Sequence, residues 1–153
     1  MARHVTDRDL GWQKIKRELE AASRLEVAVG LFYGDKNSDG TQVVEYGTYN
    51  EFGTDSIPSR PFMRTAFDEN RGNIQSDIDR QSARLTAGKV SAQTALTIIG
   101  QKHASRIQNT ITGRDFLPRL SPETVKRKKG SEKTLVDTGA LVNSVKISVR
   151  GRT

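Results

Sequence analysis

Apolar side chains near the N-terminus recur at helical spacing and then give way to a short continuous apolar run. The recurring positions are Trp12, Ile15, Leu19 and Ala22. Their spacing of three or four residues predicts a helix with one apolar stripe, and Thr6 is placed to cap it. Residues 25–33 (LEVAVGLFY) are apolar, β-branched and aromatic, but the run is too short for a helix. They predict a largely buried strand.

The next apolar residues suit a helix that ends at a glycine. In residues 41–52 the aromatic side chains are three residues apart, which favours a short helix over a strand. Gly53 then falls where a helix end requires a positive φ. Pro58 and Pro61 fix their own φ and force the preceding residue into an extended conformation. We therefore predict an extended, projecting arm over residues 53–63.

A narrower apolar stripe follows the arm. It consists of Met63, Phe67, Ile74, Ile78 and Leu85, with spacings of four and seven residues. This stripe predicts one long helix over residues 61–87 that packs against a single partner, with Pro61 in its first turn. Gly72 would weaken the middle of this helix by about 1 kcal/mol relative to alanine.

The second half of the chain predicts three more helices and one strand. Ser91 is placed to cap a helix that runs to about Thr112, and Ser121 to begin a short helix that ends at Gly130. Asp137 is a capping residue for a third helix. Residues 145–149 (VKISV) alternate apolar and polar side chains, as an edge strand does, and can pair with residues 25–33. The order of elements predicts an α+β fold with helices on one face of a small sheet.

Composition indicates one polar, basic domain. The 153 residues suffice for a single domain over 1–153 with its own core, although only 34% of them are hydrophobic. The chain has no cysteine, which excludes disulfides and thiolate metal sites. No apolar run approaches the roughly 18 residues that a membrane span requires, so no membrane partner is expected.

The positive charge is concentrated near the C-terminus. Residues 1–113 contain 15 Lys and Arg against 14 Asp and Glu, whereas residues 114–153 contain 10 against 4. The densest run is Lys126, Arg127, Lys128 and Lys129. Such a run can meet the phosphates of DNA, an acidic protein surface, or only solvent.

No pattern in the chain favours an enzyme. His103 lies on the apolar face of its predicted helix, where a packed histidine is the expected reading. Asp35, Asn37 and Asp39 alternate as in a calcium loop, but Tyr46 stands where the bidentate Glu of that loop belongs. Nucleophile-elbow and phosphate-loop motifs are missing from the sequence. We expect no catalytic residues, no metal and no cofactor.

Two segments resemble the signature sequences of a family of phage proteins. Residues 50–63 (NEFGTDSIPSRPFM) match a pattern of NEFGT followed by IPARPF, with Ser59 in place of the usual alanine. Residues 135–145 (LVDTGALVNSV) match LxDTGxLxxSI, with Val145 in place of isoleucine. In their order and separation these signature segments are similar to those of phage neck proteins. This family is also called head–tail joining or tail-completion proteins, and includes the class of the lambda minor tail protein Z.

The resemblance implies a structural virion protein rather than an enzyme. Such a protein is assembled in the host cytoplasm and joins the DNA-filled head to the tail. The partners that it implies are further copies of the chain in a ring, expected to be a hexamer, the portal and head-closure proteins, and the tail terminator and tail tube proteins. DNA passing through the ring is an additional candidate contact.

Candidate contact residues follow from the two signature segments and the basic run. For contacts with neighbouring subunits or partners they are Phe52, Ile57, Pro58, Arg60, Pro61, Phe62, Met63, Asp137, Thr138 and Leu141. Lys126, Arg127, Lys128 and Lys129 are candidates for contact with DNA or with an acidic partner. Two alternatives stay open: a tail-terminator or head-closure ring protein, and a free nucleic-acid-binding protein, although no recognition motif supports the latter.

Overall fold

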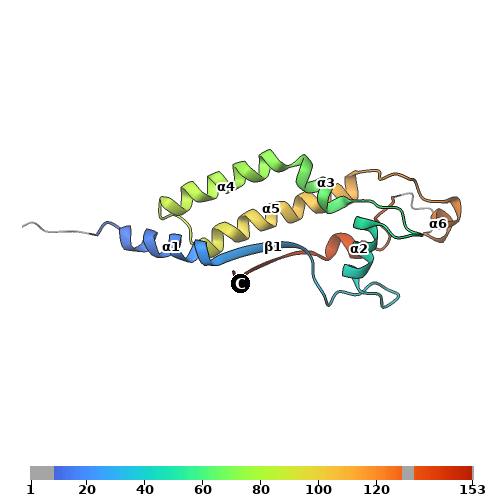
Figure 1. Cartoon of the computed structure of the whole chain (residues 1–153), viewed down its shortest axis with the longest axis horizontal. Coiled ribbons are helices and arrows are strands. Elements are labelled where there is room, and N and C mark those ends of the chain that lie inside the picture. Colours follow the sequence, from blue (N-terminus) through green and yellow to red (C-terminus); the bar gives the residue numbers. More distant parts are fainter. Residues whose placement is uncertain (1–8, 129–132, 153) are drawn as a thin grey trace, which may run out of the picture.

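A computed structural model describes residues 9–128 and 133–152, and the predicted α+β class is confirmed (Figure 1). In chain order the elements are α1 (Trp12–Arg24), β1 (Leu25–Leu31), α2 (Val43–Phe52), α3 (Phe62–Glu69), α4 (Arg71–Thr86), α5 (Ala92–Gly113), α6 (Pro122–Arg127), α7 (Ala140–Asn143) and β2 (Val145–Gly151). The predicted cap at Thr6 and the predicted helix end at Gly130 lie outside the described residues.

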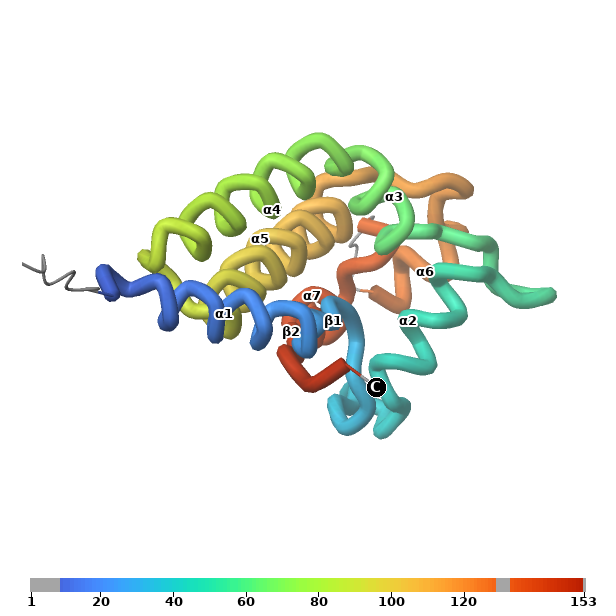
Figure 2. Tube along the Cα trace, turned by 60° about the vertical axis from the view of Figure 1, so that its left-hand side comes forward, coloured from blue at the N-terminus to red at the C-terminus, as the bar shows by residue number. Residues whose placement is uncertain are grey.

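The two strands form the small sheet that the sequence predicts. β1 and β2 pair antiparallel, with Leu25 opposite Gly151 and Leu31 opposite Val145. α5 lies along this ribbon, and α4 packs on the side of α5 that faces away from it (Figures 1 and 2). A Cβ on Gly100 of α5 would lie 2.6 Å from Cγ2 of Val27, so a glycine here allows the helix to approach the sheet closely. β1 is mostly half-buried rather than largely buried, because a ribbon of two strands is narrow.

The predicted single helix over residues 61–87 is two helices that meet at Asn70. α3 and α4 run in different directions (Figure 1). The Asn70 side chain donates a hydrogen bond to the carbonyl oxygen of Ala66 at 2.9 Å. Asparagine side chains compete in this way for backbone hydrogen bonds, which favours helix ends over helix interiors. The longest helix is instead α5, whose Ser91 cap is confirmed by a 3.1 Å hydrogen bond from the Thr94 N–H to Oγ of Ser91.

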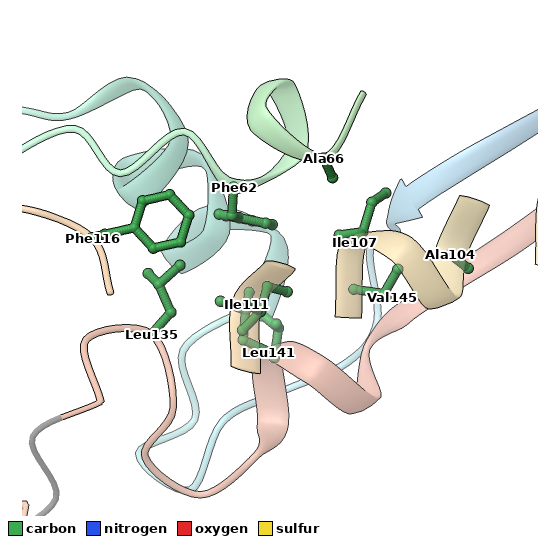
Figure 3. Packing of buried hydrophobic residues seen from close by; sticks show 10 residues of the cluster. Phe62, Ala66, Ala104, Ile107, Ile111, Phe116, Leu135, Leu141 and Val145 are labelled. Carbon is green, nitrogen blue, oxygen red and sulfur yellow. The ribbon is translucent and has the colours of Figure 1, made fainter. Parts of the chain in front are cut away.

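The apolar core lies where α3, α7 and the C-terminal half of α5 meet (Figure 3). Its largest fully buried side chains are Phe62, Ile107, Ile111 and Val43. Leu135, Leu141 and Val145 bring the C-terminal segment into the same cluster. Both signature segments therefore contribute side chains to one core. Within the described residues, no helix combines the length and apolarity that a membrane span requires.

Candidate functional site

The two signature segments line one cavity. Its volume is about 620 Å³, a typical size for a ligand site. The first segment contributes Asn50, Ser56, Ile57, Pro58 and Arg60, and the second contributes Leu135, Asp137, Thr138, Ala140 and Leu141. Further lining comes from residues 118–121, from two side chains of α6 and from five other positions: Thr124 and Arg127, and Asn37, Val43, Tyr46, Lys128 and Thr134. We call this space the signature cavity.

The first segment folds into a closed loop. Gly53 ends α2 with φ of 79°, and a Cβ there would lie 3.0 Å from the backbone nitrogen of Ser59. Glycine is therefore required both for its backbone conformation and for space. The Thr54 N–H donates to the carbonyl oxygen of Ile57 at 2.8 Å, and the Ile57 N–H donates back to Thr54 Oγ1 at 3.0 Å. The tip of this loop extends outward beyond the neighbouring helices (Figure 2).

The acidic residue of the same segment caps the helix that follows the loop. The Glu51 carboxylate accepts hydrogen bonds from the N–H of Met63 at 2.8 Å and of Arg64 at 3.0 Å. A carboxylate here satisfies free N–H groups and interacts favourably with the positive end of the α3 dipole. The sequence predicted Pro61 as the first residue of this helix. In the structure Pro61 is the N-cap residue, and α3 begins at Phe62.

The apolar candidates of this segment divide between core and surface. Phe62 is fully buried in the core, so it presents no surface to a partner in this fold. Ile57, Pro61 and Met63 are half-buried, and Pro58 is exposed. Phe52 is 68% exposed, with the Arg64 guanidinium carbon 6.0 Å from the centre of its ring. Phe52 is thus the aromatic candidate that faces outward.

In the second segment the predicted cap at Asp137 is wrong. α7 begins at Ala140 and follows Gly139, and the only side-chain oxygen near its first N–H within the described residues is Thr138 Oγ1, 3.4 Å from the Ala140 nitrogen. The chain needs two further residues after Asp137 to complete the turn into the helix. Leu141 is buried in the core, whereas Asp137 and Thr138 are exposed beside the cavity.

Arg60 is a buried cation at the wall of the signature cavity. The residue is 7% exposed, and its Nη2 donates a hydrogen bond to the carbonyl oxygen of Pro118 at 3.3 Å. Its Nε has no hydrogen-bond partner, and it forms no ion pair with a carboxylate, within the part of the chain that the structure describes. Burial lowers the pKa of Arg60, but a guanidinium keeps its charge in proteins.

The basic run divides into exposed side chains and one that is hydrogen-bonded to the chain. Lys126 and Arg127 are exposed. The Lys128 ammonium group donates hydrogen bonds to the carbonyl oxygens of Lys133 at 2.6 Å and Val136 at 2.7 Å, so it is held against its own chain. Burial lowers the pKa of Lys128, while the nearby Asp137 carboxylate raises it. Lys129 lies outside the described residues.

The remaining chemical candidates have structural contacts. His103 packs edge-on against Phe67 with ring centroids 6.1 Å apart, and burial lowers its pKa. Asp35 pairs with Lys146 at 2.7 Å, and Asp39 accepts the Thr41 N–H at 2.9 Å. Among residues 9–128 and 133–152, no cluster of histidine and acidic side chains has the arrangement of a metal site.

Sequence reasoning missed two features of this region. Arg119 and Leu120 line the signature cavity although no local pattern marks them, since only the tertiary fold brings them to Arg60. A second hollow of about 500 Å³ lies between β1 and α2 and is lined by Gly30, Gly47, Phe52 and Met63, among others. We call it the β1–α2 groove.

Comparisons of the chain with protein-family models, with curated proteins and with solved structures find no significant match.

Proposed function

We propose that this chain is a structural protein of the phage neck that joins the DNA-filled head to the tail, acting as a ring of identical subunits. The observation that carries the proposal is that the two segments resembling neck-protein signatures line one cavity and share one core. A chance similarity of two short segments would not require them to meet. Their meeting supports the view that they form a single unit.

A ring needs two different complementary surfaces on each subunit. The β1–α2 groove is our candidate for one of them. Phe52 at this groove is exposed, and Tyr49 on α2 is 44% exposed. Within the described residues β1 pairs only with β2, so its other edge carries backbone groups that a neighbouring chain can pair with.

The proposal is tested by electron microscopy of particles from a phage or prophage in which this gene carries a stop codon. We expect DNA-filled heads and complete tails that remain separate, and joined virions after complementation with the wild-type gene. Tails of uncontrolled length would favour a tail terminator, and heads that lose their DNA would favour a head-closure protein. Intact virions without complementation would overturn the proposal.

The proposed ring surface is tested by complementation with a Phe52→Ala variant. Loss of an exposed aromatic side chain from an interface centre typically costs 2 kcal/mol or more, so we expect joined particles to fall by about tenfold or more. Trp12→Ala is the matched control, because Trp12 is a similarly exposed aromatic residue on α1, away from the groove. Phe62→Ala is unsuitable for this test, since it removes a core side chain.

A further inference from the structure

We propose that the signature cavity binds a carboxylate side chain presented by a protein segment, with Arg60 as the buried cation that receives it. The cavity has polar and apolar walls, and among the described residues that line it the cationic side chains outnumber the acidic ones. Its ligand is therefore a short stretch of a partner chain in which an acidic residue stands next to an apolar one.

Arg60 is a buried charge that makes few hydrogen bonds to the described residues. A buried charge is expensive unless it is paired and hydrogen-bonded. The single hydrogen bond that its guanidinium makes to Pro118 leaves donors unused, and its Nε is buried without a partner among the described residues. Guanidinium groups bind carboxylates through two parallel hydrogen bonds. A carboxylate is thus the group that fits the donors which Arg60 leaves unused within residues 9–128 and 133–152.

The described side chains around the cavity carry more positive than negative charge. Arg119, Arg127 and Lys128 line it together with Arg60, while Asp137 is its acidic lining residue. Burial lowers the pKa of Lys128, and the positive charge of Arg60, which lines the same cavity, lowers it further. An incoming anion relieves the repulsion between these two cations. Asp137 already provides part of that relief from the exposed rim.

The limited access to Arg60 and the apolar walls of the cavity favour a protein carboxylate over the phosphate of a DNA duplex. Arg60 is almost fully buried and lines the cavity together with residues 56–58 and 118–121, so its ligand has to be narrow enough to reach it. A side-chain carboxylate meets this requirement, whereas the phosphates of a duplex lie on a broad, rigid cylinder. The walls formed by Ile57, Leu120 and Leu135 also suit an apolar side chain better than a sugar–phosphate backbone.

This inference rests on the cavity itself and deepens the proposed function only in naming the chemistry of a partner. A binding measurement on the isolated chain tests the cavity, whereas particle assembly tests the role in the neck. A protein that binds the acidic segment but is dispensable for joining would refute the role alone. A protein required for joining that ignores the segment would refute the cavity alone.

The test is fluorescence anisotropy with a labelled peptide in which leucine and glutamate alternate, compared with the same peptide carrying glutamine for glutamate. We expect saturable binding of the acidic peptide and binding at least about tenfold weaker for the glutamine peptide, because only a carboxylate pairs with the guanidinium. Arg60→Lys keeps the charge but loses the paired geometry, and we expect about tenfold weaker binding.

Two exposed positions keep the test decisive if Arg60→Lys folds poorly. Arg127→Gln removes a cation that lines the cavity, so binding is expected to weaken several-fold. Arg80→Gln is the matched control and should leave binding unchanged, because Arg80 is an exposed arginine of α4 that does not line the cavity. Asp137→Asn removes the competing carboxylate, so binding is expected to tighten. An increase in affinity for the acidic peptide is a result that general damage to the fold would not produce.

Three results would overturn the proposal. The glutamine peptide could bind as well as the acidic one, which would mean that the carboxylate is not recognised. Arg127→Gln and Asp137→Asn could both leave the affinity unchanged, which would place the peptide elsewhere. A duplex oligonucleotide could displace the acidic peptide and prove sensitive to the same substitutions, which would assign the cavity to phosphate.

Discussion

The two ends of the molecule are stabilised by different kinds of interaction, apolar packing at one end and largely polar contacts at the other. At the end formed by α2, α3, α7 and the second half of α5, fully buried apolar side chains such as Phe62 and Ile111 fill the core (Figure 3). At the opposite end α1 contains no buried residue, and its Trp12 is 63% exposed. The contact between α4 and α5 has polar residues at its centre, with Asp77 and Gln81 buried.

The difference shows which half of the molecule has the more tightly defined conformation. Apolar packing, the 53–59 loop and the Glu51 cap all lie around the signature cavity, whereas the other end relies on an ion-pair cluster of Asp77 with Lys102 and Arg106. Asp77 is buried, while its two partners keep some exposure. The cavity end is thus the more rigidly specified half, as expected if it carries the binding surface.

The largest effect that separates the two halves is expected from Phe62→Ala. Removing a fully buried phenylalanine leaves a cavity and typically costs 3–5 kcal/mol, so the free energy of unfolding should fall by about that amount. Phe52→Ala, ten residues earlier in the same segment but exposed, should change it by no more than about 0.5 kcal/mol. Urea denaturation measures both. Equal losses would contradict the division of this segment into core and surface.

Asp77→Asn tests the ion-pair cluster between α4 and α5. The substitution keeps the shape but removes the charge that Lys102 and Arg106 contact, so we expect a loss of about 1–3 kcal/mol in the free energy of unfolding. Asp79→Asn is the matched control, because Asp79 lies on the same helix and is exposed. An unchanged midpoint for Asp77→Asn would mean that the apolar contacts of α4 suffice.

The same cluster predicts a pH dependence with a definite sign. The hydrogen bonds from Lys102 and Arg106 lower the pKa of Asp77 below its ordinary value of 3.8. The unfolded chain therefore takes up this proton first, and the stabilisation by Asp77 is complete well above pH 3.8 and is lost as the pH falls through the lower pKa of the folded protein. Urea denaturation between about pH 7 and about pH 2 should show a shallower acid loss for Asp77→Asn than for the wild type. Parallel curves would contradict this assignment.

The fold could be predicted where one local signal dominated. A short run of apolar, β-branched and aromatic residues predicted β1, the alternation of apolar and polar residues predicted β2, and Ser91 predicted the start of α5. The break at Asn70 was missed because the apolar stripe of residues 63–85 runs through it without interruption. In this case a side-chain hydrogen bond to Ala66 outweighs periodicity.

The site could be predicted only in part, for a different reason. The signature segments were visible as sequence patterns, but their chemistry depends on which side chains turn inward. Proline geometry suggested that Arg60 and Phe62 belong to a projecting arm, whereas the loop closes through Thr54 and returns both residues to the interior. The hydrogen bond from Arg60 to Pro118 joins residues 58 positions apart in the chain, and Arg119 lines the same cavity as Arg60. No local sequence pattern encodes this arrangement.

A smaller effect is expected from Glu51→Gln at the start of α3. The neutral amide has one acceptor oxygen in place of two, so it can replace only one of the hydrogen bonds from the Met63 and Arg64 N–H groups, and it also loses the interaction of a full charge with the helix dipole. We expect a loss of about 1 kcal/mol in the free energy of unfolding. Glu20→Gln is the control, since Glu20 is an exposed residue on α1 that lies outside the first turn of that helix. If both variants lose the same amount, the cap contributes nothing specific.

The smallest effect is an increase in the free energy of unfolding, and it is expected in the half that contains α1 and α4. Gly72 lies in α4, and no atom of another element would lie within 4 Å of a Cβ placed there. Gly72→Ala should therefore raise the free energy of unfolding by about 0.5–1 kcal/mol, because alanine restricts the unfolded chain and favours the helix. Gly100→Ala is the opposite case, since its Cβ would lie 2.6 Å from Val27 and 3.3 Å from Ile147. Overpacking there should cost about 1–3 kcal/mol. A gain at Gly100 would mean that α5 can move away from the sheet.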